Sequence, residues 1–165
     1  MRKWLFAVGA AALAAVGSAH PAAAAAPTQA PFNVSATTVL TGICAFPVTV
    51  MGSANGTQTV FTDRNDNTTR IEIRATEQDV FSANGKTLVG LPFTIVAHEL
   101  YDPQTGELTH LYGTGVGERV PLPGGDLFLT AGRVDFILHP DASFLLQPDV
   151  GAQGNIAGFC AALAP

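Results

Sequence analysis

Two histidines and a glutamate flank one tight turn, and these residue types can do proton or metal chemistry. His98 and Glu99 come before the turn DPQTG (residues 102–106), and His110 follows it. A glutamate beside a histidine can form an acid–base pair. Two histidines on neighbouring strands can instead begin a metal site.

The register of the hairpin decides which of these residues meet. A four-residue loop pairs Asp102 with Glu107, which sets Glu99 opposite His110. A change of one residue would bring His98 and His110 face to face. The pattern supplies no third ligand and no nucleophile, so we favour an ordinary cross-strand pair on a solvated face. We expect no catalytic residue and no metal ion here, and keep Glu99, His98 and His110 as a candidate ligand or acid–base site.

A second polar stretch, DRNDNTT, begins like a calcium loop. Asp63, Asn65 and Asn67 alternate as oxygen ligands would. The sixth place, where such loops need glycine, holds Thr68, and the twelfth holds Arg74 in place of a bidentate glutamate. The stretch therefore fits a polar hairpin turn better than a calcium site.

The chain has two cysteines, Cys44 and Cys160, near the two ends of its main domain. Neither lies in a CxxC pair or beside a histidine, so a redox or metal role is not indicated. In an oxidising compartment two such thiols pair. A bond across so long a loop stabilises a fold by about 4 to 5 kcal/mol in the chain-entropy model. We predict a structural Cys44–Cys160 disulfide.

The glycine-rich stretch GTGVG has a phosphate loop only in outline. Gly113, Gly115 and Gly117 alternate within a strand pattern, with no lysine and no helix after them. Such glycines favour a strand that coils sharply or lets a large side chain lie across it.

The N-terminus has the pattern of a secretory signal peptide. Arg2 and Lys3 precede the uncharged run WLFAVGAAALAAVG, and small residues follow where a signal peptidase cleaves. We assign residues 1–25 to the signal, with cleavage within 19–25, and residues 26–40 to a flexible Ala/Pro/Thr segment. The mature chain shows no second long apolar run, so we expect a secreted protein without a transmembrane segment.

The charge of the mature chain limits its partners. The signal carries two of the eight basic residues and none of the thirteen acidic ones, which leaves six against thirteen and a net charge of −7. Scattered cations on an acidic protein give no footprint for nucleic acid. No cofactor motif appears. The expected partner is an unidentified small molecule or an envelope or extracellular component.

The elements that would position these residues are mainly strands. Apolar and polar residues alternate in RIEIRATE and RVDFILH, as in half-buried antiparallel strands, and SANGT, DRNDNT, SANGK, DPQTG, LPGGD and HPDAS read as turns. We expect about eight strands in a meander, closed as a barrel or, alternatively, folded as a sandwich. They lie near 44–51, 58–63, 69–80, 87–101, 107–116, 119–130, 132–139 and 143–148. The segment NIAGFCAAL predicts one short amphipathic helix capped by Asn155. Residues 41–165 then form a single disulfide-clamped β domain.

Several short motifs resemble those of an uncharacterised family of secreted all-β proteins from actinobacteria. The likeness lies in CAFPV (44–48), the TG turn of DPQTGE (102–107), the GxG strand and the closing CAAL (160–163). It covers nearly all of the mature chain. The resemblance implies the fold and the compartment, and it transfers no catalytic residue.

Three functions are compatible with these features. We expect first a secreted, non-catalytic β-domain that binds an extracellular or cell-envelope ligand, which requires an apolar cavity if the ligand is small. A structural surface protein would instead show an exposed apolar patch. A small barrel enzyme of the isomerase or cyclase type would need Glu99, His98 or His110 to project into a pocket.

Overall fold

The computed structural model describes residues 26–137 and 150–165. These residues form one antiparallel sheet of eight strands and one short helix. In chain order the elements are β1 (Thr28–Leu40), β2 (Val48–Thr62), β3 (Thr68–Ala83), β4 (Lys86–Val89), β5 (Phe93–Tyr101), β6 (Leu108–Pro121), β7 (Leu127–Asp135), β8 (Val150–Ala152) and α1 (Ile156–Leu163). The predicted all-β class and the C-terminal helix are confirmed.

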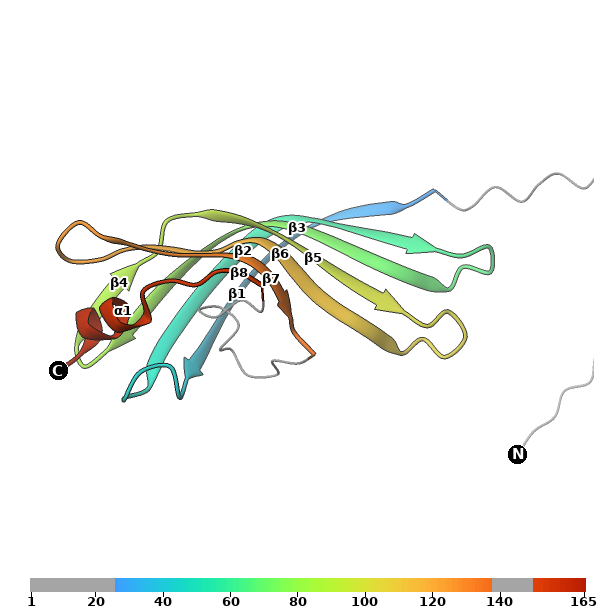
Figure 1. The fold of residues 1–165 in the computed structure, drawn as a ribbon. Coiled ribbons are helices and arrows are strands. Elements are labelled where there is room, and N and C mark those ends of the chain that lie inside the picture. Colours follow the sequence, from blue (N-terminus) through green and yellow to red (C-terminus); the bar gives the residue numbers. More distant parts are fainter. Residues whose placement is uncertain (1–25, 138–149) are drawn as a thin grey trace, which may run out of the picture.

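The strands lie in the order β1-β2-β3-β5-β6-β7-β8. The short strand β4 pairs with the last residues of β3, beyond the part of β3 that pairs with β5. The sheet is long and strongly curved, with α1 at one end of its concave side (Figure 1). Among the described residues β1 and β8 are open edges. The predicted closure into a barrel is therefore not found in this part of the chain.

Four of the predicted turns join neighbouring strands. They are DRNDNT, SANGK, DPQTG and LPGGD. In SANGK both Asn84 (φ 51°) and Gly85 (φ 74°) adopt the left-handed region, which the two-residue hairpin turn requires. The turn predicted at HPDAS and the strand predicted at 143–148 lie outside the described residues.

The turn predicted at SANGT is wrong, because these residues lie in the middle of β2. Asn55 pairs with Asn33 of β1 and with Thr76 of β3. Pairing on both sides overrides the local preference of Asn-Gly for a hairpin. A Cβ at Gly56 would lie 2.0 Å from the carbonyl oxygen of Arg74, so the glycine serves close strand contact instead of a turn.

Residues 26–40 are also not the flexible segment that their composition suggested. Thr28–Leu40 is strand β1, which pairs with β2 over its whole length. Most of its side chains are exposed, so it shows little apolar alternation. An edge strand also tolerates Pro31, which lacks an N–H.

Other strand bounds differ from the prediction through local breaks. The predicted strand 87–101 is divided into β4 and β5, with Pro92 between them. The predicted boundary between 107–116 and 119–130 falls inside β6, which continues to Pro121. The real turn is LPGGD, where Leu122 N donates to Asp126 O at 2.8 Å.

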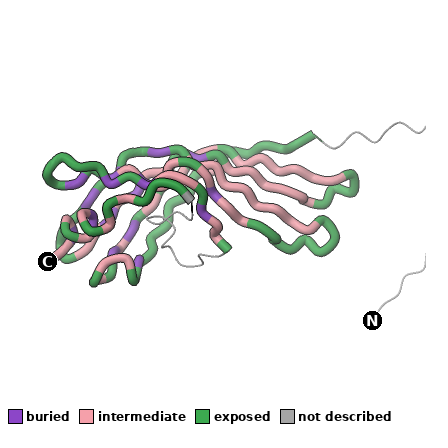
Figure 2. The backbone as a smooth tube through the Cα atoms, viewed as in Figure 1, coloured by how far each residue is buried: buried purple, intermediate pink, exposed green. Residues whose placement is uncertain are grey.

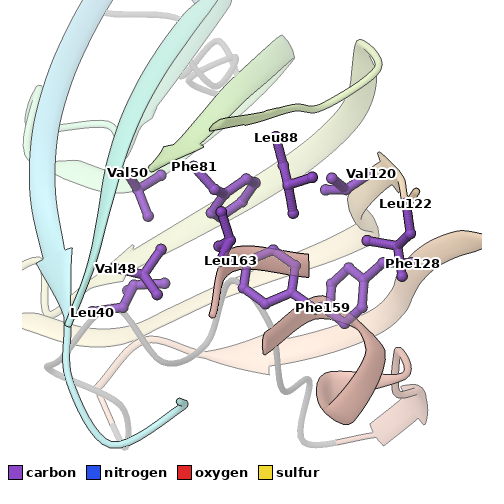
Figure 3. Close-up of a cluster of buried hydrophobic side chains, with 10 residues drawn as sticks. All are labelled: Leu40, Val48, Val50, Phe81, Leu88, Val120, Leu122, Phe128, Phe159 and Leu163. Carbon is purple, nitrogen blue, oxygen red and sulfur yellow. The ribbon is translucent and has the colours of Figure 1, made fainter. Parts of the chain in front are cut away.

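The apolar core lies at the end of the concave face that carries α1. Buried positions gather there, whereas the hairpin tips at the opposite end are exposed (Figure 2). Side chains from seven elements and the turn between β6 and β7 pack together (Figure 3). The cluster consists of Leu40, Val48, Val50, Phe81, Leu88, Val120, Leu122, Phe128, Phe159 and Leu163.

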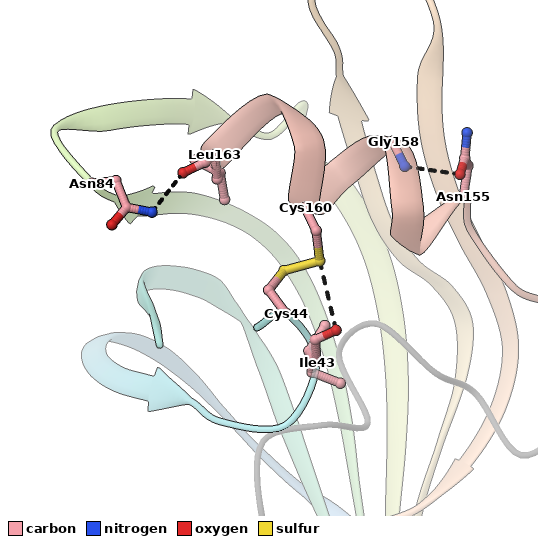
Figure 4. The surroundings of a disulfide bond; sticks show 7 residues. All are labelled: Ile43, Cys44, Asn84, Asn155, Gly158, Cys160 and Leu163. Atoms are coloured by element: carbon pink, nitrogen blue, oxygen red, sulfur yellow. Dashed lines mark hydrogen bonds between the residues drawn. A yellow bond between two sulfur atoms is a disulfide. The ribbon is translucent and has the colours of Figure 1, made fainter. Parts of the chain in front are cut away.

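Helix α1 closes this end of the molecule. Its Phe159 ring meets Phe81 edge-on at 5.1 Å between centroids. The side chain of Asn155 accepts a hydrogen bond from Gly158 N at 2.9 Å, which confirms the predicted N-cap. The predicted disulfide is confirmed too: Cys160 on α1 is bonded to Cys44, with 5.5 Å between the Cα atoms (Figure 4).

Candidate functional site

A cavity of about 480 Å³ lies on the concave face, next to the apolar core. Strands β1, β2, β3, β5, β6 and β7 all contribute to its wall. Most of the lining side chains are apolar, and they include Phe32, Ala54, Ile73, Ala97, Val134 and Phe136. Because the sheet is curved, inward-facing residues of strands near both of its edges line the same hollow.

The hollow exists because small residues occupy inward positions. Ala54, Ala75 and Ala97 stand on three adjacent strands where larger residues would fill the space. On β6 the predicted close contact is confirmed: a Cβ at Gly113 would lie 2.9 Å from the ring of Phe136. The glycine thus lets this aromatic ring lie across the strand and form part of the wall.

Two carboxyl groups of β3 line the cavity at the end nearer the core. Ile73, Ala75, Glu77 and Asp79 all point inward, because alternate residues of a strand share a face. Asp79 is 1% exposed. On β2, Gly52 stands opposite Asp79, and a Cβ there would lie 2.5 Å from Asp79 Oδ1. The absence of a side chain at this position makes room for the carboxylate.

A third carboxyl, Glu118 of β6, reaches the same region through a β-bulge. The pairing of β6 with β7 shifts between Val116 and Glu118, so Gly117 is the extra residue. A bulge of one residue exchanges the two faces of a strand. Glu118 and Val120 therefore point inward, and both are 0% exposed.

Burial raises the pKa of all three carboxyl groups. The pKa of Glu77 rises to about 7, because burial disfavours its charge and Asp79 lies nearby. Burial, a hydrogen bond with Asp79 and the charges of both neighbours hold the pKa of Glu118 well above its usual range. Burial also raises the pKa of Asp79, whereas the hydrogen bond with Glu118 lowers it. The raised pKa favours the protonated, neutral form of Glu118 at neutral pH.

The carboxyl cluster, Glu77, Asp79 and Glu118, is incompletely satisfied by the protein. Within residues 26–137 and 150–165, Asp79 Oδ2 and both Glu118 oxygens find no protein N–H or hydroxyl donor. In the same ranges no group of three or more side chains is arranged to hold a metal ion. Buried carboxyl oxygens without donors are unusual in folded proteins and call for a partner such as a water molecule, an ion or a ligand group.

The residues singled out from the sequence lie elsewhere. The predicted pairing of Glu99 with His110 is wrong: Glu99 pairs with Leu111, and His110 pairs with Leu100. The reason is a register shift between Leu100 and Tyr101, which the turn rule did not anticipate.

The same shift keeps the two histidines apart. His98 pairs with Tyr112, on which its ring stacks at 5.0 Å between centroids, and His110 is exposed. His98 Nδ1 lies 3.8 Å from Glu72 on the outer face. Glu99 belongs to the inner face and accepts a hydrogen bond from Tyr101, which raises the pKa of Tyr101 to about 12. The candidate acid–base residues are thus divided between the two faces of the sheet.

The calcium-like stretch forms the polar hairpin turn that we favoured. Asp63 accepts hydrogen bonds from Asn65 N at 2.8 Å and from Asn67 N at 2.9 Å. The bond from Asn67 is the main cause that lowers the pKa of Asp63. The carboxylate thus stabilises its own turn.

Sequence reasoning missed the carboxyl cluster, although part of the signal was present. The alternation that assigns Ile71, Ile73 and Ala75 to one face continues to Glu77 and Asp79. Two acids on an apolar face of a strand predict a buried polar site. No such signal reveals Glu118, because its inward direction depends on the bulge.

No protein-family model matches this chain, and no curated protein or solved structure shows significant similarity to it. The single helix of the described residues is too short to cross a bilayer. The cavity and its carboxyl groups are therefore the features of this chain that bear on its function.

Proposed function

We propose that this chain is an exported, non-catalytic binding protein that holds a small, mainly apolar molecule against the concave face of its sheet. One observation carries the proposal: a largely apolar cavity of about 480 Å³ has buried carboxyl groups at its inner end. Ligand pockets typically enclose about 300 to 1,000 Å³ and combine apolar walls with a few polar groups.

The surrounding structure is suited to a preformed site. Long strands fix the cavity wall by backbone pairing, and the core cluster supports its inner end. The disulfide holds α1 against that core. A wall that is rigid before binding loses less entropy when the ligand arrives.

Export is supported by the signal-peptide pattern of residues 1–25 and by the disulfide. Disulfides persist in extracellular and periplasmic compartments and are rare in the cytosol. The resemblance to secreted actinobacterial proteins agrees with this part of the proposal.

A pair of variants tests binding. Ala97→Phe places a ring in the cavity, whereas Val96→Phe adds the same ring to the outer face of the same strand. Fluorescence titration with the apolar dye phenylnaphthylamine is expected to show at least about tenfold weaker binding to Ala97→Phe. Val96→Phe is expected to bind as the parent does. Equal binding by all three proteins would contradict the proposal.

A second function, acid–base catalysis on the bound molecule, is favoured by Glu77. Its pKa of about 7 matches that of an effective general acid or base at neutral pH. An isomerisation needs only a proton removed from one atom and returned to another. Chromatography of an extracted ligand after incubation with the parent and with Glu77→Gln tests this: conversion by the parent alone supports catalysis, and no conversion leaves binding as the function.

A further inference from the structure

Resting on the proposed function, we infer that the ligand carries a cationic amine, which binds Asp79 and Glu77 at the inner end of the cavity. The apolar part of such a molecule would lie along the wall formed by β2, β3 and β5. Three features of the site point to this class of ligand.

First, Asp79 offers an unused acceptor to the cavity. It lines the cavity, it is 1% exposed, and its Oδ2 has no donor among the described residues. An ionised carboxylate can accept several hydrogen bonds, and leaving one unmade in an apolar site is costly. A group that donates more than one hydrogen bond fits this position.

Second, the described basic side chains do not line the cavity. Arg70 and Arg74 are on the outer face of β3, because they alternate with its inward residues. Arg70 lies over the Phe61 ring, and Arg133 lies over the Tyr112 ring. The Lys86 ammonium binds the carbonyl oxygen of Ala164 beside α1. The protein thus leaves the carboxyl cluster without a countercharge in the described ranges.

Third, the carboxyl cluster can carry negative charge at the inner end of the cavity, since Glu77 ionises above about pH 7. Burial raises the pKa of Asp79, but the neighbouring Glu118 opposes that rise, whereas Asp79 raises the pKa of Glu118 further, so a negative charge is favoured on Asp79 over Glu118. Among the residues that the structure describes, the titratable side chains that face this point are Glu77, Asp79 and Glu118, since β2 contributes Gly52 and β5 contributes Phe93 there. A bound ammonium would neutralise the charge and donate two or three hydrogen bonds. A carboxylate ligand would be repelled.

Three probes of equal chain length separate the alternatives. Decylamine, decanol and decanoate are each used to displace phenylnaphthylamine from the oxidised full mature protein, at a pH above the pKa of Glu77, which is about 7. An alkylamine remains protonated there, as lysine does. Decylamine is expected to act at a concentration at least about tenfold lower than decanol, because hydrogen bonds to charged groups are about twice as strong as neutral ones.

Variants assign the preference to the carboxyl groups. Asp79→Asn and Glu77→Gln are expected to reduce the advantage of decylamine over decanol to below about threefold while decanol still binds. Glu72→Gln removes a carboxylate from the outer face of the same strand and is expected to keep the full preference. Circular dichroism checks that each variant is folded. If Asp79→Asn does not fold, Glu77→Gln alone is sufficient for the test.

The outcomes distinguish the two proposals. If decanol or decanoate displaces the dye as well as decylamine does, the amine inference is overturned while cavity binding stands. If the parent binds neither the dye nor any probe, both are overturned. If Glu72→Gln loses the preference as fully as Glu77→Gln, the amine is bound outside the cavity and the inference fails.

Discussion

Glu77, Asp79 and Glu118 form the candidate binding site, and their burial also lowers the stability of the folded chain. Each loses hydration on folding, and the described residues supply no basic partner in return. Burying acids in this way lowers stability unless they are neutral or paired. Residues kept at such a cost usually serve function, and the cost itself can be measured.

The first prediction concerns pH. The pKa of Glu77 is about 7 in the folded chain and 4.5 when exposed, so folding favours its protonated form. The contribution of protonated Glu77 to the free energy of unfolding is fully present below about pH 4.5 and is lost as the pH rises through about 7. The free energy of unfolding should therefore fall over this range by up to about 3 kcal/mol, since one pKa unit corresponds to about 1.4 kcal/mol.

Urea unfolding of the parent, Glu77→Gln and Glu72→Gln over this pH range checks the effect. Glu77→Gln should show a shallower decline, and a remaining slope is expected from Asp79 and Glu118, whose pKa values are also raised. Glu72→Gln should follow the parent. A Glu77→Gln curve parallel to that of the parent would contradict the prediction.

The second prediction concerns Gly52. A methyl group at this position would lie 2.5 Å from Asp79 Oδ1, so Gly52→Ala should cost about 1 to 3 kcal/mol by overpacking. In the Asp79→Ala background the same change should cost much less, because the clashing atom is gone. A double-mutant cycle by urea unfolding measures this coupling. Additive costs would show that the two residues do not compete for space.

At this scale the sequence permits two of the three carboxyl groups of the cluster to be predicted. The alternation of β3 extends to Glu77 and Asp79, so a reader who follows it past Ala75 finds two acids on the inner face. Glu118 cannot be found in this way. Its direction follows from a one-residue bulge, and the pairing partner that fixes the bulge is distant in sequence.

Elements whose signals are local were predictable, and elements that depend on pairing were not. Helix α1 has its apolar spacing and its cap within one short segment. Asn84-Gly85 forms a turn, yet Asn55-Gly56 lies within β2 because that strand pairs on both sides. β1 was missed because an edge strand with exposed side chains has no alternation to recognise.

The third prediction belongs to α1. Asn155→Ala removes the acceptor for Gly158 N and should lower the free energy of unfolding by about 1 kcal/mol. Asn155→Asp keeps an acceptor, so its free energy of unfolding should lie within a few tenths of a kcal/mol of the parent value. Urea unfolding of both variants checks this, and equal losses in the two would show that the cap contributes nothing.

For the molecule as a whole, the fourth prediction concerns the disulfide, which joins residues 116 positions apart. Cys44→Ser with Cys160→Ser should lower the free energy of unfolding by about 4 kcal/mol, because the unfolded chain regains its freedom. Urea unfolding of the double variant and of the reduced parent should agree. An unchanged midpoint would show that the core cluster alone holds α1 in place.

The same sulfur bond also decides what a protease can do to this protein. The hairpin tips, such as Pro103–Gly106, are exposed and are the natural places for a cut. Any single cut between Cys44 and Cys160 leaves both fragments covalently joined, and the strand ladders still hold them in register. A nicked molecule would keep its hollow, and its two fragments would separate only after the disulfide is reduced.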